Sequence, residues 1–414
     1  MNATTEAGRR IQSLDIVRGI AVMGILAMNI VAFAMPFSAY MNPASFGSES
    51  VADYAAWAVN FVLVDGKMRG LFSFLFGAST LLVIERAETS GQSAAKVHYS
   101  RMLWLLVFGL LHFYLIWFGD ILAGYALVGL LLYFFRNLKV RALIIWGVAL
   151  VLVQCLLMAA LSLRVYQLGA QGTLTGTEAE EWAGFQEAFG RLTAAHLSEE
   201  MALHLGPWTN LVRNQLTEHG AEPFFGIFFF GWETLAYMLF GMAALKTGFF
   251  RGEWTAARYR RVALIGLGIT IPVYAALAWA NWRAGFTMES TILYSMTATT
   301  PFRPIMVFAY AALIILAFRN GGWLAERVAA AGRAAFTNYL GTSILMTALF
   351  YGWGFGLYGS MTRVELYVPV LAMWAAMLLW SKPWLERFRY GPFEWLWRSL
   401  ARLEFQPMRK REGA

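Results

Sequence analysis

A series of about ten long apolar segments is the feature that most constrains this chain, because each has roughly the 20 residues that a helix needs to cross a bilayer. The segments lie near 14–35, 66–84, 101–119, 120–136, 141–163, 224–245, 259–281, 299–318, 333–350 and 365–381. Hydrophobic residues make up 59% of the 414 residues and charged residues only 14%. Roughly 45–50% and 25% are usual for a soluble domain. The sequence therefore predicts an all-α, polytopic integral membrane protein with about 10 transmembrane helices.

The distribution of basic residues predicts the orientation. If the amino terminus is cytoplasmic, most of the 33 lysine and arginine residues fall in segments on the cytoplasmic side, including Arg9, Arg10 and the tail from Lys382 onward. By the positive-inside rule, both termini should face the cytoplasm. The net charge of +8 is then a topology signal facing anionic lipid, and we expect no nucleic-acid partner. Although 14–35 resembles a signal peptide, we interpret it as a span because Asp15 and Arg18 lie at its start.

One long polar connection divides the chain into an amino-terminal membrane half (1–163), an extracytoplasmic connection (164–223) and a carboxy-terminal membrane half (224–414). Apolar residues recur at helical spacing within 177–215, which predicts surface helices that form either a lid or a linker. The tail 392–405 has an apolar face and separate arginines, a pattern typical of a helix in the cytoplasmic interface.

Several polar groups fall inside the apolar segments, where an ionisable side chain costs at least a few kcal/mol unless it is paired or hydrated. Asn29, His112 and Glu233 should each lie in the middle or outer half of the membrane. Arg303 lies within a further segment. Such groups are candidates for a functional site, and the alternative is that they join helices structurally.

The sequence DGKMRG at 65–70 combines two glycines with three charges, Asp65, Lys67 and Arg69, and interrupts an apolar region. A break of this kind at membrane depth is tolerated where the backbone is buried in protein or lines water. The alternative is that 51–64 is an interfacial helix and the charges lie at the outer surface.

His112 is the predicted general base, because a neutral imidazole accepts a proton near physiological pH. Asp120 follows eight residues later, about 12 Å along a continuous helix. We therefore expect no direct pairing between them, and we expect the carboxylate that orients His112 to be Asp65 or Glu233. The alternative is a histidine satisfied by a neighbouring hydroxyl or carbonyl.

Other patterns point away from common sites. The glycines of 352–359 follow no strand and predict an outer loop. The remaining histidines lack the spacing of metal ligands, so no metal is expected. No G-x-S-x-G elbow is present, and the single cysteine, Cys155, allows no internal disulfide.

Several stretches carry a resemblance to a known family: RIQSLDIVRGIAVMGILAMNI at the amino end, LFSFLFG (71–77), GLLHFYLIWFGDILAGYALVG (109–129), GRAAFTNYLGTS (332–343) and GPFEWLWRSL (391–400). With these stretches the chain resembles the YeiB-like bacterial membrane proteins, the domain-of-unknown-function family 418, over nearly its whole length. The resemblance implies a multi-pass protein of the bacterial inner membrane.

The amino-terminal half is also similar to the transmembrane acyltransferases typified by heparan-α-glucosaminide N-acetyltransferase, which share an L/V-D-x-x-R-G opening followed by an asparagine. Onto this chain the opening carries Asp15, Arg18, Gly19 and Asn29. In those enzymes an intramembrane histidine follows the asparagine closely, whereas 30–56 here contains none.

These observations predict a membrane acyltransferase that moves an acyl group from cytoplasmic acyl-CoA to a hydroxyl or amine of an extracytoplasmic glycan, lipid-linked or small-molecule acceptor. The predicted catalytic groups are His112, Asn29, Asp65 and Glu233. The predicted binding groups are Asp15, Arg18, Lys67, Arg69, Asp120 and Arg303. The alternative is a transporter in which the same groups form a polar relay.

Overall fold

The structure is a computed structural model that describes residues 11–410. These residues form an all-helical bundle, with one isolated β-bridge between Phe388 and Arg409. The predicted all-helical fold is confirmed. Arg9, Arg10 and Arg411, which contribute to the charge argument above, lie outside the described residues.

Each predicted span coincides with a helix. These helices are α1 (Gln12–Ala34), α4 (Lys67–Thr89), α5 (Ala94–Leu115), α6 (Leu122–Phe135), α7 (Val140–Gly169), α11 (Glu222–Lys246), α12 (Ala256–Arg283), α14 (Arg303–Ala317), α16 (Ala335–Phe350) and α17 (Tyr367–Arg387). Within the described part, six segments are long and apolar enough to cross a membrane: α1, α7, α11, α12, α17 and the stretch Val51–Thr89, which contains α3 (Val51–Leu63) and α4. The count of ten spans remains a prediction.

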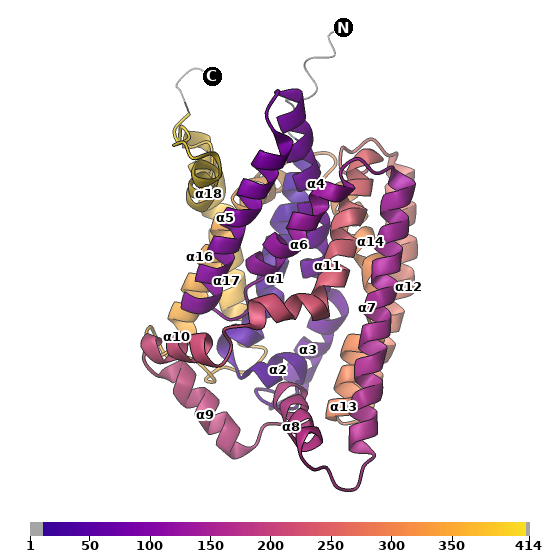
Figure 1. The fold of residues 1–414 in the computed structure, drawn as a ribbon, viewed down its shortest axis with the longest axis vertical. Coiled ribbons are helices and arrows are strands. Elements are labelled where there is room, and N and C mark those ends of the chain that lie inside the picture. Colours follow the sequence, from indigo (N-terminus) through magenta and orange to yellow (C-terminus); the bar gives the residue numbers. More distant parts are fainter. Residues whose placement is uncertain (1–10, 411–414) are drawn as a thin grey trace.

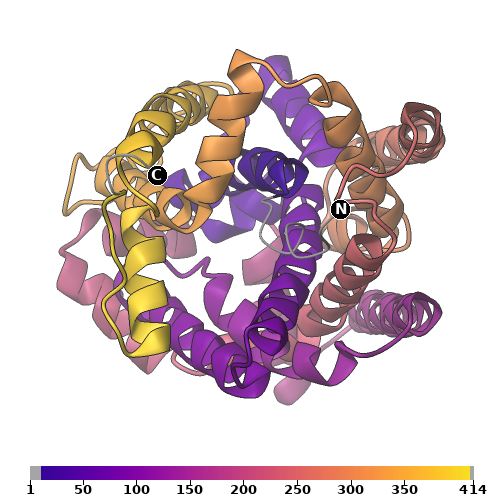
Figure 2. The same cartoon turned by 90° about the horizontal axis from the view of Figure 1, so that it is seen from above.

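Helix α1 lies near the centre of the bundle when the molecule is seen from above (Figure 2), and 83% of its most apolar window is buried. Its closest neighbour is α15 (Trp323–Arg333). A Cβ atom on Gly19 would lie 2.1 Å from the Val328 carbonyl oxygen, and one on Gly332 would lie 1.8 Å from that of Asp15. The two backbones therefore approach this closely because both positions are glycine.

The two ends of the bundle differ. Helix α18 (Pro392–Arg402) lies at the end where α1 begins, and α2 (Phe37–Met41), α8 (Thr177–Phe189), α9 (Ala194–Leu205) and α10 (Trp208–Thr217) lie at the opposite end (Figure 1). The helices expected within 177–215 and in the tail are confirmed. Helix α18 packs against the bundle, where the Trp397 indole donates to the Arg101 carbonyl at 3.0 Å.

Candidate functional site

A cavity of about 600 Å³ lies inside the bundle, lined by parts of α1, α2, α3, α6, α7 and α11 and by the start of α14. It brings together most of the predicted site residues: Asn29, Asp65, Arg69, Asp120, Glu233 and Arg303. These residues come from five separate stretches of the chain, with Asp65 and Arg69 in the same one. Polar groups that hydrocarbon would exclude are therefore gathered around one internal space.

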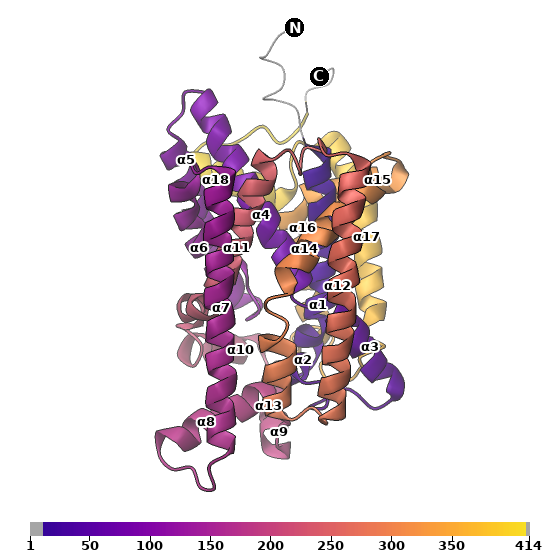
Figure 3. The same ribbon diagram turned by 90° about the vertical axis from the view of Figure 1, so that its right-hand side faces the viewer.

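Two helices are interrupted beside this cavity. Residues 64–66 separate α3 from α4, as the DGKMRG motif predicts. Residues 298–302 separate the π-helix η1 (Ile292–Thr297), which continues α13 (Met288–Thr291), from α14 (Figure 3). Gly66 has φ +69°, and a Cβ atom there would lie 2.8 Å from Nε of Arg303. The two breaks therefore touch, and the amino ends of α4 and α14 both lie at the cavity, where each contributes about half a positive charge.

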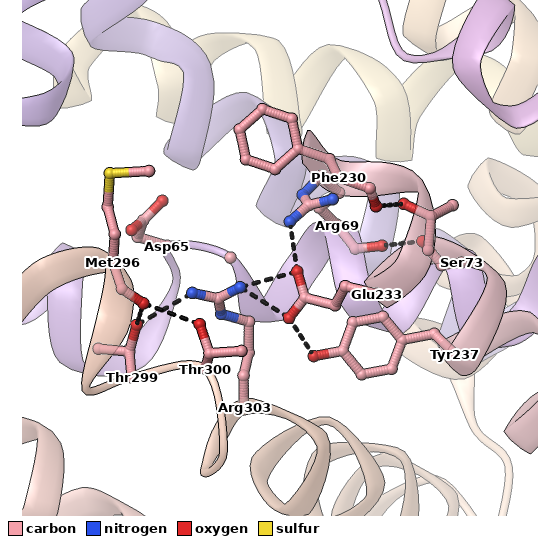
Figure 4. Close-up of polar contacts among 12 residues, drawn as sticks. Asp65, Arg69, Ser73, Phe230, Glu233, Tyr237, Met296, Thr299, Thr300 and Arg303 are labelled. Atoms are coloured by element: carbon pink, nitrogen blue, oxygen red, sulfur yellow. Dashed lines mark hydrogen bonds and ion pairs between the residues drawn. The ribbon is translucent and has the colours of Figure 1, made fainter. Parts of the chain in front are cut away.

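An ion cluster joins these two helix starts to α11 (Figure 4). Glu233 accepts from Arg69 Nη2 at 2.8 Å and from Arg303 Nη1 at 2.7 and 2.8 Å. The Tyr237 hydroxyl donates to the same carboxylate at 2.8 Å, and Arg303 Nη2 donates to Thr299 Oγ1 at 3.0 Å. The Glu233 side chain is 1% exposed. Its carboxylate therefore holds two guanidinium groups in fixed positions, and it is not available to orient His112.

Asp65 lies within the first break, and Lys67 is the first residue of α4. Asp65 lines the cavity and accepts from the Tyr40 hydroxyl at 3.1 Å. Lys67 is fully buried, donates to the Phe61 carbonyl and lies 3.5 Å from the centre of the Tyr274 ring. Lys67 is not among the residues that line the cavity.

His112 and Asp120 form a direct pair, contrary to the expectation from the sequence. His112 Nδ1 lies 2.8 Å from Asp120 Oδ1, and Asp120 Oδ2 accepts from the Ala123 amide at 2.7 Å at the start of α6. The prediction was wrong because α5 ends at Leu115, so the chain turns back and the spacing of a continuous helix does not apply. The orienting carboxylate is therefore neither Asp65 nor Glu233.

The other imidazole nitrogen, Nε2, is buried and has no hydrogen-bond partner among residues 11–410. The same holds for Nε1 of Trp117, whose ring lies 6.3 Å from that of His112. Trp117 and Asp120 line the cavity, whereas His112 does not. The imidazole thus lies just outside the cavity, held by a residue of the cavity wall.

Asn29 lines the cavity from α1 and is 6% exposed. Its side-chain amide makes no hydrogen bond to another described residue, so its donors and acceptor face the cavity. Asp15 and Arg18 lie elsewhere, near the first turn of α1. They pair with each other at 3.1 Å, and Arg18 also donates to Ser79 Oγ at 2.6 Å.

Several further polar residues of the cavity do not follow from the patterns in the sequence. Gln154 on α7 and Thr291 on α13 are nearly fully buried and line the cavity. Neither Gln154 Oε1 nor Thr291 Oγ1 has a partner among the described residues. Arg363 is 4% exposed and also lines the cavity. Gln154 inside an apolar run was a signal that could have been used, whereas Thr291 and Arg363 lie outside the predicted spans.

Helix α2, which lines the cavity, is tied to α9. Glu200 of α9 accepts from the Phe37 amide at 2.7 Å, at the start of α2, and from the Tyr358 hydroxyl at 3.3 Å. Burial raises the pKa of the Glu200 carboxyl above its ordinary value. His204, one turn further along α9, stacks on Tyr358 with ring centres 4.3 Å apart, and burial lowers its pKa to about 4. Helix α9 is therefore docked onto α2, whose Phe37, Tyr40 and Met41 line the cavity.

Comparison with known proteins gives the family. The chain is 31% identical to the uncharacterized protein YxaH of Bacillus subtilis, with 98% of each chain covered. It is 32% identical to the uncharacterized protein YeiB of Escherichia coli, with 94% of this chain and 95% of that protein covered. Residues 244–404 match the family described as protein of unknown function (DUF418). The chain belongs to the DUF418 family.

The chain is also 25% identical, over 94% of its length, to an uncharacterized 39.9 kDa protein in the amylase 3′ region of Bacillus acidopullulyticus. The DUF418 match contains Arg303 and Thr299 of the ion cluster, whereas Arg69, Glu233 and the His112–Asp120 pair precede it in the sequence. No solved structure matches the chain. The similarity to acyltransferases remains a prediction.

Proposed function

We propose that this DUF418 protein is an acyltransferase of the bacterial inner membrane, with about ten spans and both termini in the cytoplasm. It would move an acyl group from cytoplasmic acyl-CoA to a hydroxyl or amine of an acceptor bound in the cavity. The observation that supports this proposal is the His112–Asp120 pair at 2.8 Å, whose imidazole Nε2 lies beside the cavity wall without a hydrogen-bond partner in the described part of the chain. A carboxylate that fixes one nitrogen and leaves the other open is the arrangement of a general base.

In the proposed reaction, His112 Nε2 takes the proton of the acceptor hydroxyl as the oxygen attacks the thioester carbon. The carbon–sulfur bond then breaks, and the leaving thiolate takes the proton from the imidazolium, so that coenzyme A departs as a thiol. Asp120 stabilises the imidazolium that forms in between. The Asn29 amide, which faces the cavity without a partner, donates to the developing oxyanion. Because His112 lies outside the cavity lining, the acceptor reaches Nε2 when the Trp117 indole moves aside.

The test is the release of coenzyme A thiol from acetyl-CoA by purified protein, with a panel of alcohol and amine acceptors. We expect release by the wild type and a loss of roughly 10²–10⁴-fold in His112→Ala, the usual contribution of a general base. His98→Ala is the matched control, since His98 is a buried histidine on the same helix that bonds to the Gly129 carbonyl away from the cavity. Unchanged release in His112→Ala would remove His112 from the mechanism.

A second candidate is transport, and the two touching helix breaks favour it. Interrupted helices whose ends meet at a charged site within the membrane are typical of secondary transporters. In that case the wild type would release no thiol with any acceptor, and protein in liposomes would take up substrate in a manner that Glu233→Gln abolishes.

A further inference from the structure

One end of the cavity presents guanidinium groups and helix amino ends to an entering ligand. Arg69 and Arg303 line it together with two carboxylates, Asp65 and Glu233, whereas the buried Lys67 lies outside the lining. Glu233 contacts both arginines, whereas Asp65 makes its hydrogen bond with the Tyr40 hydroxyl. The amino ends of α4 and α14 add further positive potential at the same place. An anion that enters this end of the cavity would therefore be stabilised.

Arg69 has hydrogen-bonding capacity left for such an anion. A guanidinium group carries five N–H donors, and among the described residues Arg69 donates only through Nη2, to Glu233. Its side chain is 17% exposed and lines the cavity. Arg303 differs, because it uses Nη1 for both oxygens of Glu233 and Nη2 for Thr299. Arg69 is thus the group that would contact an anion directly, and Arg303 positions Glu233.

Elsewhere in the same cavity, two buried side-chain oxygen atoms offer sites for a neutral hydrogen-bonding group of a ligand. Gln154 Oε1 and Thr291 Oγ1 are buried without partners among residues 11–410, and an unsatisfied buried acceptor is destabilising. Gln154 Oε1 can only accept a hydrogen bond. A ligand that satisfies it must therefore carry an O–H or N–H group.

The remaining wall is apolar and reaches the surface. Phe225 and Phe229 of α11 line the cavity and yet are 64% and 54% exposed. Further phenylalanines, Phe224 and Phe228, are exposed on the same turns. The cavity therefore opens beside the start of α11 through a surface that suits acyl chains and not water.

We propose that the cavity binds an amphiphile that carries one acidic group and a nearby hydroxyl. The acidic group contacts Arg69, the hydroxyl donates to Gln154, and the apolar chain passes Phe225 and Phe229 toward the bilayer. This proposal rests on the proposed function in one respect, since such a molecule would be the acyl acceptor. The ion cluster then serves substrate recognition as well as helix packing.

The experiment measures binding to the full-length protein in nanodiscs of neutral lipid, without acyl-CoA. The probes are monolauroyl lysophosphatidic acid (acid and hydroxyl), decyl phosphate (acid alone) and monolauroylglycerol (hydroxyls alone). We expect saturable binding of the lysophosphatidic acid, and binding of monolauroylglycerol at least tenfold weaker, since a hydrogen bond to a charged group contributes about 1.5–3 kcal/mol. Equal affinity for the acidic and neutral probes would overturn the proposal.

Variants separate recognition from structural roles. Arg69→Gln should weaken binding of the lysophosphatidic acid about tenfold or more and leave monolauroylglycerol unchanged. Glu233→Gln should strengthen binding of the lysophosphatidic acid, because the internal carboxylate no longer competes for Arg69. Gln154→Leu should weaken the lysophosphatidic acid but not decyl phosphate. The control is Arg327→Gln, which removes an arginine that bonds to the Leu378 carbonyl outside the cavity.

The outcomes distinguish this proposal from the proposed function. If Glu233→Gln weakened binding as much as Arg69→Gln, the cluster would be a structural pair and the anion site would be refuted. Thiol release with no preference for acidic probes would refute the anion site and leave acyl transfer standing. Specific binding of the acidic probe with no thiol release would refute acyl transfer and leave the anion site standing.

Discussion

Neutralising Glu233 tests the most consequential contact in the structure. Glu233→Gln keeps the size of the side chain but leaves Arg69 and Arg303 as two adjacent guanidinium groups with no carboxylate between them. Removing one partner of a buried ion pair costs about 3–5 kcal/mol, because the remaining charge is desolvated and uncompensated. Both arginines lose their partner here, since their Nη atoms lie 2.7–2.8 Å from the same carboxylate. We therefore expect a loss at the upper end of that range.

The free energy of unfolding can be measured by SDS titration in mixed micelles, followed by circular dichroism. The matched comparison is the triple variant Arg69→Met, Glu233→Met, Arg303→Met, which should recover much of the loss because no charge stays buried. Glu326→Gln, which breaks the exposed pair with Lys382, should change little. The reasoning fails if Glu233→Gln unfolds like the wild type, or if the triple variant is as unstable as the single one.

Three further predictions concern backbone contacts and the outer helices. Gly66→Ala should destabilise the protein by about 2 kcal/mol or more, since an L residue at positive φ costs roughly 1–2 kcal/mol and its Cβ would displace Arg303. The same unfolding titration measures this loss. Gly268→Ala in α12, where a Cβ atom would meet no other atom, is the control. Gly241→Ala should cost about 1–3 kcal/mol by overpacking, because its Cβ would lie 1.8 Å from the Phe74 carbonyl oxygen, and thermal unfolding would reveal it. Docking of α9 onto α2 should be strongest below the ordinary carboxyl pKa. It should weaken as pH rises through the raised pKa of Glu200, because the buried carboxyl group then ionises. Hydrogen exchange of residues 194–205 measured against pH would show this dependence, and Glu200→Gln should remove it.

Which polar residues line the cavity could largely be predicted from the sequence, because a polar side chain inside an apolar segment stands out against its neighbours. Asn29, Asp65, Arg69, Glu233 and Arg303 were all identified in this way, and all line one cavity. Asp15 and Arg18 were named for their motif and lie apart from it. Lys67 was expected at the site, yet it is not among the residues that line the cavity, and its ammonium lies over the Tyr274 ring.

How these groups pair could not be read from the sequence. His112 and Asp120 meet because α5 stops three residues after the histidine, and a helix end of that kind leaves no clear mark in an apolar run. Glu233 meets Arg303 across 70 positions of the chain, which only packing determines. The break at 298–302 was missed since residues 299–318 read as one apolar segment, although Pro304 follows Arg303 at the helix start.

The sequence by itself determined a helical membrane protein, because hydrocarbon requires every backbone amide and carbonyl of a span to be paired within the span. It also determined which side chains the hydrocarbon core of a bilayer would exclude. The tertiary structure alone decided that these side chains share one cavity, that two arginines hold Glu233, and that Asp120 holds His112. Those facts depend on where helices end and how closely their glycines let them approach, and hydropathy carries no information about either.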